Sequence, residues 1–373
     1  MQAFRSRSRG VAIGLALLAF SAIADEAVAP AASDPMAKPA ERQPHASSAL
    51  VLDLAFAGAG RIVAVGERGH ILLSDDGRAW RQAEVPLRST LTAVSAVGSD
   101  VWAVGHDGVV LHSGDAGESW EIQRRDPWTE STDGSEHDLR QGVPLLDVLF
   151  SDARNGVAIG AYSLMLTTAD GGRSWSAGRI EVIGEAQAGA ATADDDDLAE
   201  DAEDGPGSDI FTAEELAIGQ ESDPHLNAIA RTGSGAFVIV GERGAVFRSR
   251  DGARWERSQL PYDGSMFGVI GYEGDRVLAF GLRGHVFESD NLGVDWREVD
   301  TDTELSLMGG AALGDGGAVI VGANGTVLRR AGADAALALT THTAAGVIAA
   351  VLPAADGALV VAGEHGVDRY PNE

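Results

Sequence analysis

The chain has 373 residues, 45% of them hydrophobic, and no cysteine. This length and apolar content allow two domains or one large all-β domain, and they exclude global disorder. The net charge of −28 excludes a nucleic-acid binder that works by neutralising phosphates, and it argues against binding to an anionic membrane surface. Without cysteine the chain has no thiol catalysis, disulfide, Cys-ligated zinc or iron–sulfur cluster.

Residues 1–24 have the pattern of a secretory signal peptide. Three arginines between residues 5 and 9 precede an apolar run over residues 11–23, and a small-residue pattern ends at Ala24. The run is shorter than the roughly 20 residues that a membrane anchor needs. We therefore expect cleavage after Ala24, a periplasmic or secreted protein, and no direct membrane insertion of the mature chain. Residues 25–48, rich in Ala and Pro, are expected to be a flexible lead-in.

A repeat of about 40 residues organises residues 49–373. Its marker is an apolar strand that ends in glycine, then a two-residue turn, usually a second glycine, and another alternating strand. The seven turns begin at Gly66, Gly105, Gly160, Gly241, Gly281, Gly322 and Gly363. These glycines lie 39, 55, 81, 40, 41 and 41 residues apart. A period of about 40–50 residues with four short strands per repeat is typical of a β-propeller.

The sequence therefore predicts an all-β fold, a seven-bladed β-propeller of four-stranded antiparallel blades with one long acidic insertion. In the second repeat, alternation predicts strands over residues 91–97, 101–105, 109–113 and 120–124. The last repeat holds only three predicted strands, which end at Tyr370. The end of the lead-in, before Leu50, is a candidate for its fourth strand. Such a strand would close the ring between the two termini and remove exposed sheet edges.

A second motif, Ser/Thr-x-Asp-x-Gly-x-Ser/Thr-Trp, follows the third strand of several repeats. Residues 113–120 and 168–175 fit it, 289–296 fits with two replacements, and 74–80 and 249–255 are one residue shorter. In such a turn the Asp accepts main-chain N–H groups, the Gly takes an unusual dihedral angle, and the Trp packs between sheets. We expect these aspartates to be structural rather than catalytic, and the five tryptophans to be mostly buried.

The Gly-x-x-Gly hairpin together with the Ser-x-Asp-x-Gly-x-Ser-Trp turn is the Asp-box, or BNR, repeat of propellers. Its near-seven-fold use behind a signal peptide resembles the photosystem II stability/assembly factor-like propeller family, over roughly residues 50–370. The resemblance implies a scaffold that binds a protein partner. Relatives of this type in non-photosynthetic bacteria are associated with large envelope exporters, so the resemblance suggests an envelope membrane complex as partner.

The segment of residues 184–224 contains 14 Asp or Glu residues and no Lys or Arg. Such a block repels itself and is typical of a disordered spacer. Docking to a basic partner is the first alternative. Specific calcium binding is the second, although the spaced Asp-x-Asp-x-Asp-Gly pattern of a calcium loop is missing. We predict no metal site and no cofactor in this chain.

The turns between the second and third strands of a propeller open on the face that commonly binds ligands. These turns carry the candidate ligand- or partner-binding residues Arg68, His106, Arg243, Arg283 and His365. In an acidic protein they would create a local positive potential, and arginine offers bidentate recognition of carboxylate or phosphate. The alternative is that each arginine pairs with a neighbouring acid, such as Glu67 or Glu242, and only keeps the turn soluble.

Asp-box propellers include sialidases, which resemble this chain in their repeat but use an arginine cluster, a Tyr nucleophile and acidic partners. This chain has four tyrosines, lacks the Arg-Ile/Leu-Pro signature near its first blade, and has seven predicted blades rather than six. It also lacks zinc-pair, nucleophile-elbow and phosphate-loop motifs. We expect no catalytic residues, no nucleic-acid partner, and a monomeric protein-binding scaffold. The alternatives are a propeller that binds an anionic glycan or small molecule and, after it, a sialidase-like glycosidase.

Overall fold

The computed structural model describes residues 38–126, 142–177, 223–344 and 346–371. The chain divides into two units, Met1–Pro35 and Met36–Glu373, and only the second contains described residues. The predicted signal peptide and nearly all of the acidic insertion lie outside the described residues. The export signal, its cleavage site and the state of the insertion therefore stay predictions.

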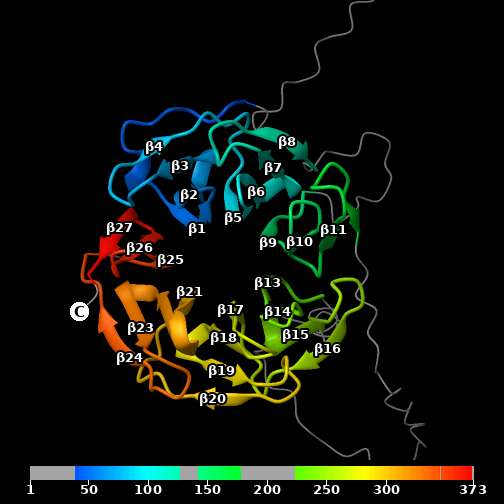
Figure 1. Cartoon of the computed structure of the whole chain (residues 1–373), viewed down its shortest axis with the longest axis vertical. Helices are drawn as coiled ribbons and strands as arrows, with labels where there is room; N and C mark the ends of the chain where they lie inside the picture. Colours follow the sequence, from blue (N-terminus) through cyan, green and yellow to red (C-terminus); the bar gives the residue numbers. More distant parts are fainter. Residues whose placement is uncertain (1–37, 127–141, 178–222, 345, 372–373) are drawn as a thin grey trace, which may run out of the picture. The chain divides into compact units, whose positions relative to one another are not determined.

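Seven antiparallel sheets form a ring around a central channel, which confirms the predicted seven-bladed β-propeller (Figure 1). In the described residues, six sheets have four strands and the sheet nearest the C-terminus has three. Colour runs round the ring from blue in blade 1 to red in blade 7, which lies beside blade 1. Within the described ranges, no helix is long and apolar enough to cross a membrane.

The strands follow one another round the ring in sequence order. Blades 1 to 3 contain β1 (Val51–Ala57), β2 (Arg61–Gly66), β3 (Ile71–Ser74), β4 (Arg81–Gln82), β5 (Leu91–Val97), β6 (Asp100–Gly105), β7 (Val110–Ser113), β8 (Glu121–Arg124), β9 (Leu145–Phe150), β10 (Gly156–Gly160), β11 (Met165–Thr168) and β12 (Ser176–Ala177). Blades 4 to 7 contain β13 (Leu226–Arg231), β14 (Phe237–Gly241), β15 (Ala245–Ser249), β16 (Glu256–Gln259), β17 (Met266–Gly271), β18 (Val277–Gly281), β19 (Val286–Ser289), β20 (Arg297–Val299), β21 (Leu307–Ala312), β22 (Ala318–Gly322), β23 (Thr326–Arg330), β24 (Ala338–Thr341), β25 (Ile348–Pro353), β26 (Leu359–Gly363) and β27 (Gly366–Tyr370).

Short 3₁₀ turns lie before β1 and between several of the strands. They are η2 (Ala46–Ser48), η3 (Glu67–Gly69), η4 (His106–Gly108), η5 (Glu242–Gly244), η6 (Leu282–Gly284), η7 (Gly314–Gly316) and η8 (Ala323–Gly325). The four strands predicted for the second repeat are present as β5 to β8, with each boundary within one residue.

The buried apolar side chains lie between blades. Within the described residues they form seven clusters, and each cluster contains side chains from two adjacent blades. One cluster joins Leu54 and Ile62 of blade 1 to Val360 of blade 7 and so closes the ring. Between blades 2 and 3, the rings of Trp102 and Phe150 stack with centroids 3.6 Å apart. Strand alternation explains this core, because the two faces of each sheet supply side chains to the two neighbouring blades.

The end of the lead-in contacts the last blade as a turn. In the described residues, β25 to β27 form a three-stranded sheet, and residues 46–48 form η2. A Cβ added to Gly366 of blade 7 would lie 1.9 Å from the carbonyl oxygen of Ser47. Earlier lead-in residues run along blade 1, where Ala40 donates its N–H to the carbonyl of Val85 over 3.0 Å. The lead-in thus covers the junction of blades 7 and 1 without supplying the fourth strand for which its position made it a candidate.

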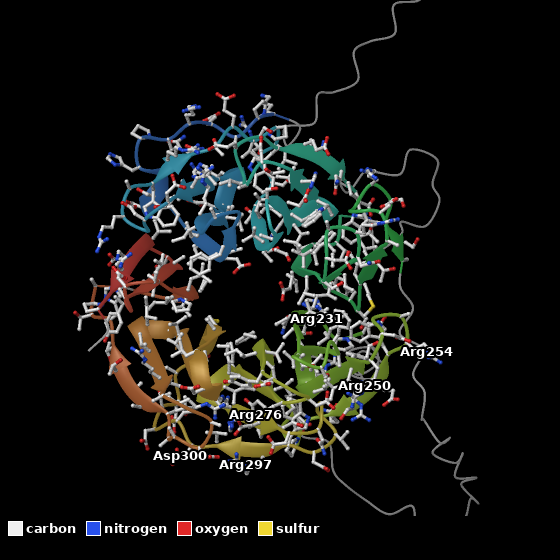
Figure 2. The ribbon with its side chains drawn as sticks, in the orientation of Figure 1. Arg231, Arg250, Arg254, Arg276, Arg297 and Asp300 are labelled. Carbon is white, nitrogen blue, oxygen red and sulfur yellow. The ribbon has the colours of Figure 1, made fainter. Side chains whose placement is uncertain are left out.

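A buried ionic network joins blades 5 and 6. Arg330 of β23 donates to Glu288 of β19 over 2.9 Å, and the two side chains are 2% and 3% exposed. Arg276 and Arg297, both on blade 5 and labelled in Figure 2, also contact Glu288. Arg330 occupies the strand position that the first Asp-box residue has in blade 5. The sixth blade, which lacks the Asp-box Trp, is therefore held to the fifth by charged hydrogen bonds.

Candidate functional site

The Asp-box carboxylates are occupied by their own turns. Asp170 accepts the N–H and the hydroxyl of Ser174 at 2.9 and 2.6 Å, and the hydroxyl of Thr168 at 2.9 Å. These hydrogen bonds, led by that from the Ser174 hydroxyl, lower the pKa of Asp170 to about 2. This geometry agrees with the structural role predicted for the motif.

The Asp-box tryptophans are less buried than the sequence led us to expect. Trp255 is 1% exposed. The other four, at positions 80, 120, 175 and 296, are only partly buried. The repeat places them at equivalent positions, but the neighbouring blade decides how much of each ring is covered.

The five predicted binding residues lie exposed on one face of the ring. Each belongs to a tip that joins the second and third strands of its blade, in blades 1, 2, 4, 5 and 7. We call this the hairpin face, and its seven tips are residues 66–69, 105–108, 160–163, 241–244, 281–284, 322–325 and 363–366. The Asp-box turns lie at the other ends of the third strands, and therefore on the opposite face.

Glycine is required at the start of each tip. In blade 1 the N–H of Glu67 donates to the carbonyl oxygen of Leu50 over 3.1 Å, which brings two segments together at Gly66. A Cβ on Gly66 would lie 2.1 Å from that oxygen. Arg68, two residues later, has a φ of 55°, in the left-handed region. The same left-handed backbone recurs at the equivalent arginines of blades 4 and 5.

Acidic residues also occur in the tips of the hairpin face. Four tips carry a carboxylate, at Glu67, Asp107, Glu242 and Glu364. The seven tips thus contain three arginines and four acidic residues. In the described part of the chain, neither Arg68 nor Arg283 forms an ion pair, so the alternative pairing of Arg68 with Glu67 is not observed.

Two of these carboxylates are bound to the start of an innermost strand. Glu242 accepts the main-chain N–H of His225 at 3.0 Å, and Glu364 accepts that of Val347 at 3.3 Å. His225 and Val347 immediately precede β13 and β25, which line the channel. The acidic side chains of blades 4 and 7 are therefore held on the channel side of the tips.

The first strand of every blade lines the central channel. Its second residue is apolar in blades 1, 3, 5, 6 and 7 and polar in blades 2 and 4. The hydroxyl of Thr92 in blade 2 donates to the carbonyl of Leu145 in blade 3 over 2.7 Å. The side-chain amide of Asn227 in blade 4 donates to the carbonyl of Met266 in blade 5 over 2.9 Å. The polar residues therefore link each of these blades to the next.

Two carboxylates also face the channel. Asp53 of β1 and Asp147 of β9 line a cavity of about 230 Å³, and no basic residue lines it. Burial raises the pKa of both carboxyls to about 7, and the charge of Asp53 adds to the effect at Asp147. Neither residue was predicted as part of a site. The usable signal is a single Asp inside an otherwise apolar strand.

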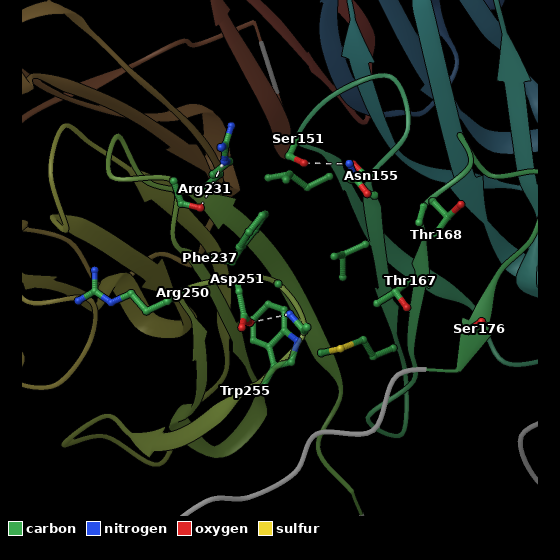
Figure 3. Close-up of a pocket in the computed structure, with 18 of the residues that line it drawn as sticks. Ser151, Asn155, Thr167, Thr168, Ser176, Arg231, Phe237, Arg250, Asp251 and Trp255 are labelled. Carbon is green, nitrogen blue, oxygen red and sulfur yellow. Dashed lines mark hydrogen bonds between the residues drawn. The ribbon is translucent and has the colours of Figure 1, made fainter.

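A larger cavity, of about 820 Å³, opens between blades 3 and 4 (Figure 3). It forms where Val157 of β10 stands at the position that Trp102 occupies in β6, three residues before the tip glycine. The ring of Phe237 lies on one wall. Its two carboxylates, Asp170 and Asp251, are Asp-box acceptors and are committed to their turns. Within the ranges that the structure covers, no group of three His, Asp or Glu side chains could hold a metal ion.

Comparisons with known proteins agree with this architecture. Among solved structures, "YCF48 bound to D1 peptide" gives a TM-score of 0.59 at 17% identity, covering 91% of this chain and 96% of that one. YCF48 from Cyanidioschyzon merolae gives 0.57 at 15% identity, over 88% and 96%. The WD40 β-propeller domain of Doa1 gives 0.58 at 10% identity, over 91% and 97%. At these identities the likenesses show the fold.

The comparisons of sequence cover less of the chain than the comparisons of structure. A comparison with curated proteins gives no match. Residues 38–129 match the model of the family described as photosynthesis system II assembly factor YCF48, which confirms the predicted family resemblance. The chain is thus a seven-bladed β-propeller that carries, over residues 38–129, the repeat of the photosynthesis system II assembly factor YCF48 family.

Proposed function

We propose that this protein is an exported, non-enzymatic scaffold that binds a protein partner on its hairpin face, with an envelope complex as the class of partner. The observation that carries the proposal is the repeated display of exposed side chains on that face. Seven tips surround one channel, and Arg68 and Arg283 project from left-handed backbone without an ion pair in the described residues. The opposite face presents Asp-box turns whose carboxylates already accept hydrogen bonds.

Two further observations support the proposal. The YCF48 structure that shares this fold is bound to D1 peptide, so a propeller of this architecture can hold a segment of another protein. The pattern of residues 1–24 predicts export, which would bring the propeller into contact with envelope proteins.

The test is capture of partner protein from a cell-envelope extract by the mature chain, residues 25–373. The combined variant Arg68→Glu, Arg243→Glu and Arg283→Glu should lose a partner that the unaltered protein retains, because reversal replaces three guanidiniums with carboxylates on the binding face. Capture by the unaltered protein should weaken as salt is raised, since exposed charges are screened. Circular dichroism and thermal melts check that the variant is folded.

A matched control reverses three arginines on the opposite face, Arg78, Arg173 and Arg254, which lie in Asp-box turns. The control should capture the partner as the unaltered protein does. Loss of the partner from the control but not from the hairpin-face variant would show that the chosen face is wrong. Full capture by both variants would overturn the proposal that the arginine tips carry the contact.

A further inference from the structure

The mouth of the channel on the hairpin face holds an open pocket of about 490 Å³. It is lined by Leu50, Leu52, Thr92, Met308, Val347, Ala349 and Glu364. Five of these seven side chains are apolar, and Val347 is 36% exposed. The Thr92 hydroxyl is already bonded to blade 3, so Glu364 is the polar group that the pocket offers to a ligand. Binding sites commonly are concave, mostly apolar, and provided with a few polar groups that orient the ligand.

The pocket is open because the side chain at the second position of the first strand differs from blade to blade. In blades 1 and 6 the second residue of the strand is Leu52 or Met308, and in blade 7 it is the small Ala349. The equivalent residues of blades 2 and 4 are polar and are used to link blades. The apolar wall of the pocket is therefore formed by three consecutive blades, 6, 7 and 1, whereas Leu146 of blade 3 and Phe267 of blade 5 lie outside the pocket.

The charges around the pocket favour a cation. Glu364 lines the pocket, and its Oε2 is held by the N–H of Val347, so the carboxylate stays at the pocket wall. Four residues line both this pocket and the channel cavity, so the two spaces adjoin. No Lys, Arg or His lines either space, so Glu364 is the charged side chain in the pocket lining. The net charge of −28 adds a long-range attraction for basic groups.

We propose that this pocket anchors the partner by taking a bulky apolar side chain that stands beside a Lys or Arg in the partner segment. This inference rests on the proposed function and specifies the chemistry of its partner. The apolar wall removes the anchor side chain from water, and the neighbouring ammonium or guanidinium pairs with Glu364 at the edge of the pocket. The tip arginines, such as Arg68, then meet acidic groups of the partner that lie farther from the anchor.

The experiment selects a random dodecapeptide phage library on the immobilised mature chain. Enriched peptides should share an aromatic or large aliphatic residue next to Lys or Arg. The affinity of a synthetic consensus peptide is then measured by fluorescence anisotropy for three variants. The first, Leu52→Ser with Met308→Ser, makes the apolar wall polar and should weaken binding about tenfold or more. The second, Glu364→Gln, should weaken binding about three- to tenfold and reduce its dependence on salt.

The third variant is a matched control, Leu146→Ser with Phe267→Ser. These residues have the same strand position in blades 3 and 5 and line the channel, but they lie outside the mouth pocket. The control should bind within about twofold of the unaltered protein, because neither side chain lines the pocket that the peptide would occupy. Near-UV circular dichroism checks that all variants keep the propeller packing.

Several results would overturn the anchor site. They are an acidic consensus, a peptide that binds the Leu52/Met308 variant normally, a control that weakens as much as that variant, and a library that yields no enriched peptide. The proposed function fails separately. If envelope capture depends on the tip arginines while the Leu52/Met308 variant captures normally, the scaffold function stands and the anchor site is wrong. If the unaltered mature chain captures no envelope protein, the proposed function fails whatever the peptides do.

Discussion

Asp53 and Asp147 occupy the same position in the first strands of blades 1 and 3, and each carboxylate accepts a main-chain N–H from the next blade. The distances are 2.8 Å from Asp53 to the nitrogen of Val94 and 2.8 Å from Asp147 to that of Ile229. The second oxygen of each carboxylate accepts the N–H of the residue that follows in its own strand. The hydroxyl of Thr92 links blade 2 to blade 3 in a similar way, and the side-chain amide of Asn227 links blade 4 to blade 5. Four successive junctions at the channel are thus linked by side-chain hydrogen bonds.

The raised pKa of these two carboxyls predicts a pH-dependent stability. Burial raises the pKa of Asp53 and Asp147 to about 7, from the ordinary value of 3.8. Between these values the folded protein binds more protons than the unfolded chain, so their contribution to stability falls as pH rises from about 4 to 7. The variant Asp53→Asn with Asp147→Asn should lose this slope. Urea unfolding at pH 5 and pH 7.5 measures the free energy of unfolding for both proteins.

The pH dependence of the unfolding free energy must be compared between the unaltered protein and the double variant, because other groups also titrate. Burial lowers the pKa of His70, so this group contributes the opposite slope below its unfolded value of 6.5. His70 is present in both proteins and cancels. Equal slopes for the unaltered protein and the double variant would show that the two aspartates titrate at ordinary values.

The loss of stability on substituting an Asp-box tryptophan should depend on how deeply its ring is buried rather than on its position in the repeat. Trp255→Ala should lower the free energy of unfolding by about 3–5 kcal/mol, because the ring is 1% exposed and its loss leaves a cavity. Trp120→Ala should cost less, since its ring is only partly buried, although its Nε1 donates to the carbonyl of Gly117 over 2.9 Å. Denaturant melts of the two variants measure both losses. A larger loss for Trp120→Ala would contradict the burial argument.

The Glu288 network predicts an asymmetric response. Glu288→Ala should destabilise the protein by about 3–5 kcal/mol, because it leaves Arg330 buried without its counter-charge. Arg330→Met should cost less, since Glu288 keeps Arg276 and Arg297. Urea melts of the two single variants give the comparison. If Arg330→Met is the more damaging change, the two blade-5 arginines do not compensate for its loss.

The contact of the lead-in with blade 7 can be tested at Gly366. This glycine has a φ of 87°, and a Cβ would lie 1.9 Å from the carbonyl oxygen of Ser47. Gly366→Ala should therefore cost more than the roughly 1–2 kcal/mol of left-handed backbone strain alone. Gly60→Ala is the matched control, because Gly60 has a φ of 100° and nothing within 4 Å of its Cβ position. Thermal melts should show a lower Tm for Gly366→Ala than for Gly60→Ala.

A truncation gives an independent check of the same contact. A chain that begins at residue 49 should melt at a lower temperature than one that begins at residue 38, because it lacks Ser47 and the hydrogen bond from Ala40 to Val85. Equal melting temperatures would mean that the lead-in does not stabilise the junction of blades 7 and 1.

The repeat by itself determined the propeller and the faces on which its turns lie. Gly66 and its equivalents are required by a contact between two segments of one blade, so they recur with the blade and are visible as a period. The alternating strands of the second repeat match β5 to β8 within one residue, because strand alternation depends on which sheet face is buried. The exposed tip residues, such as Arg68, follow from the same local geometry.

Only the tertiary structure decided what meets at the channel. Leu52 and Met308 are far apart in the chain, and they line one pocket because the ring closes. The bond from Asp53 to Val94 likewise crosses a blade junction that no local pattern specifies. Where the lead-in meets β27, residues 46–48 form a turn, and Ser47 contacts Gly366. A repeat specifies each blade through short-range contacts, whereas the channel and the closure depend on contacts between blades.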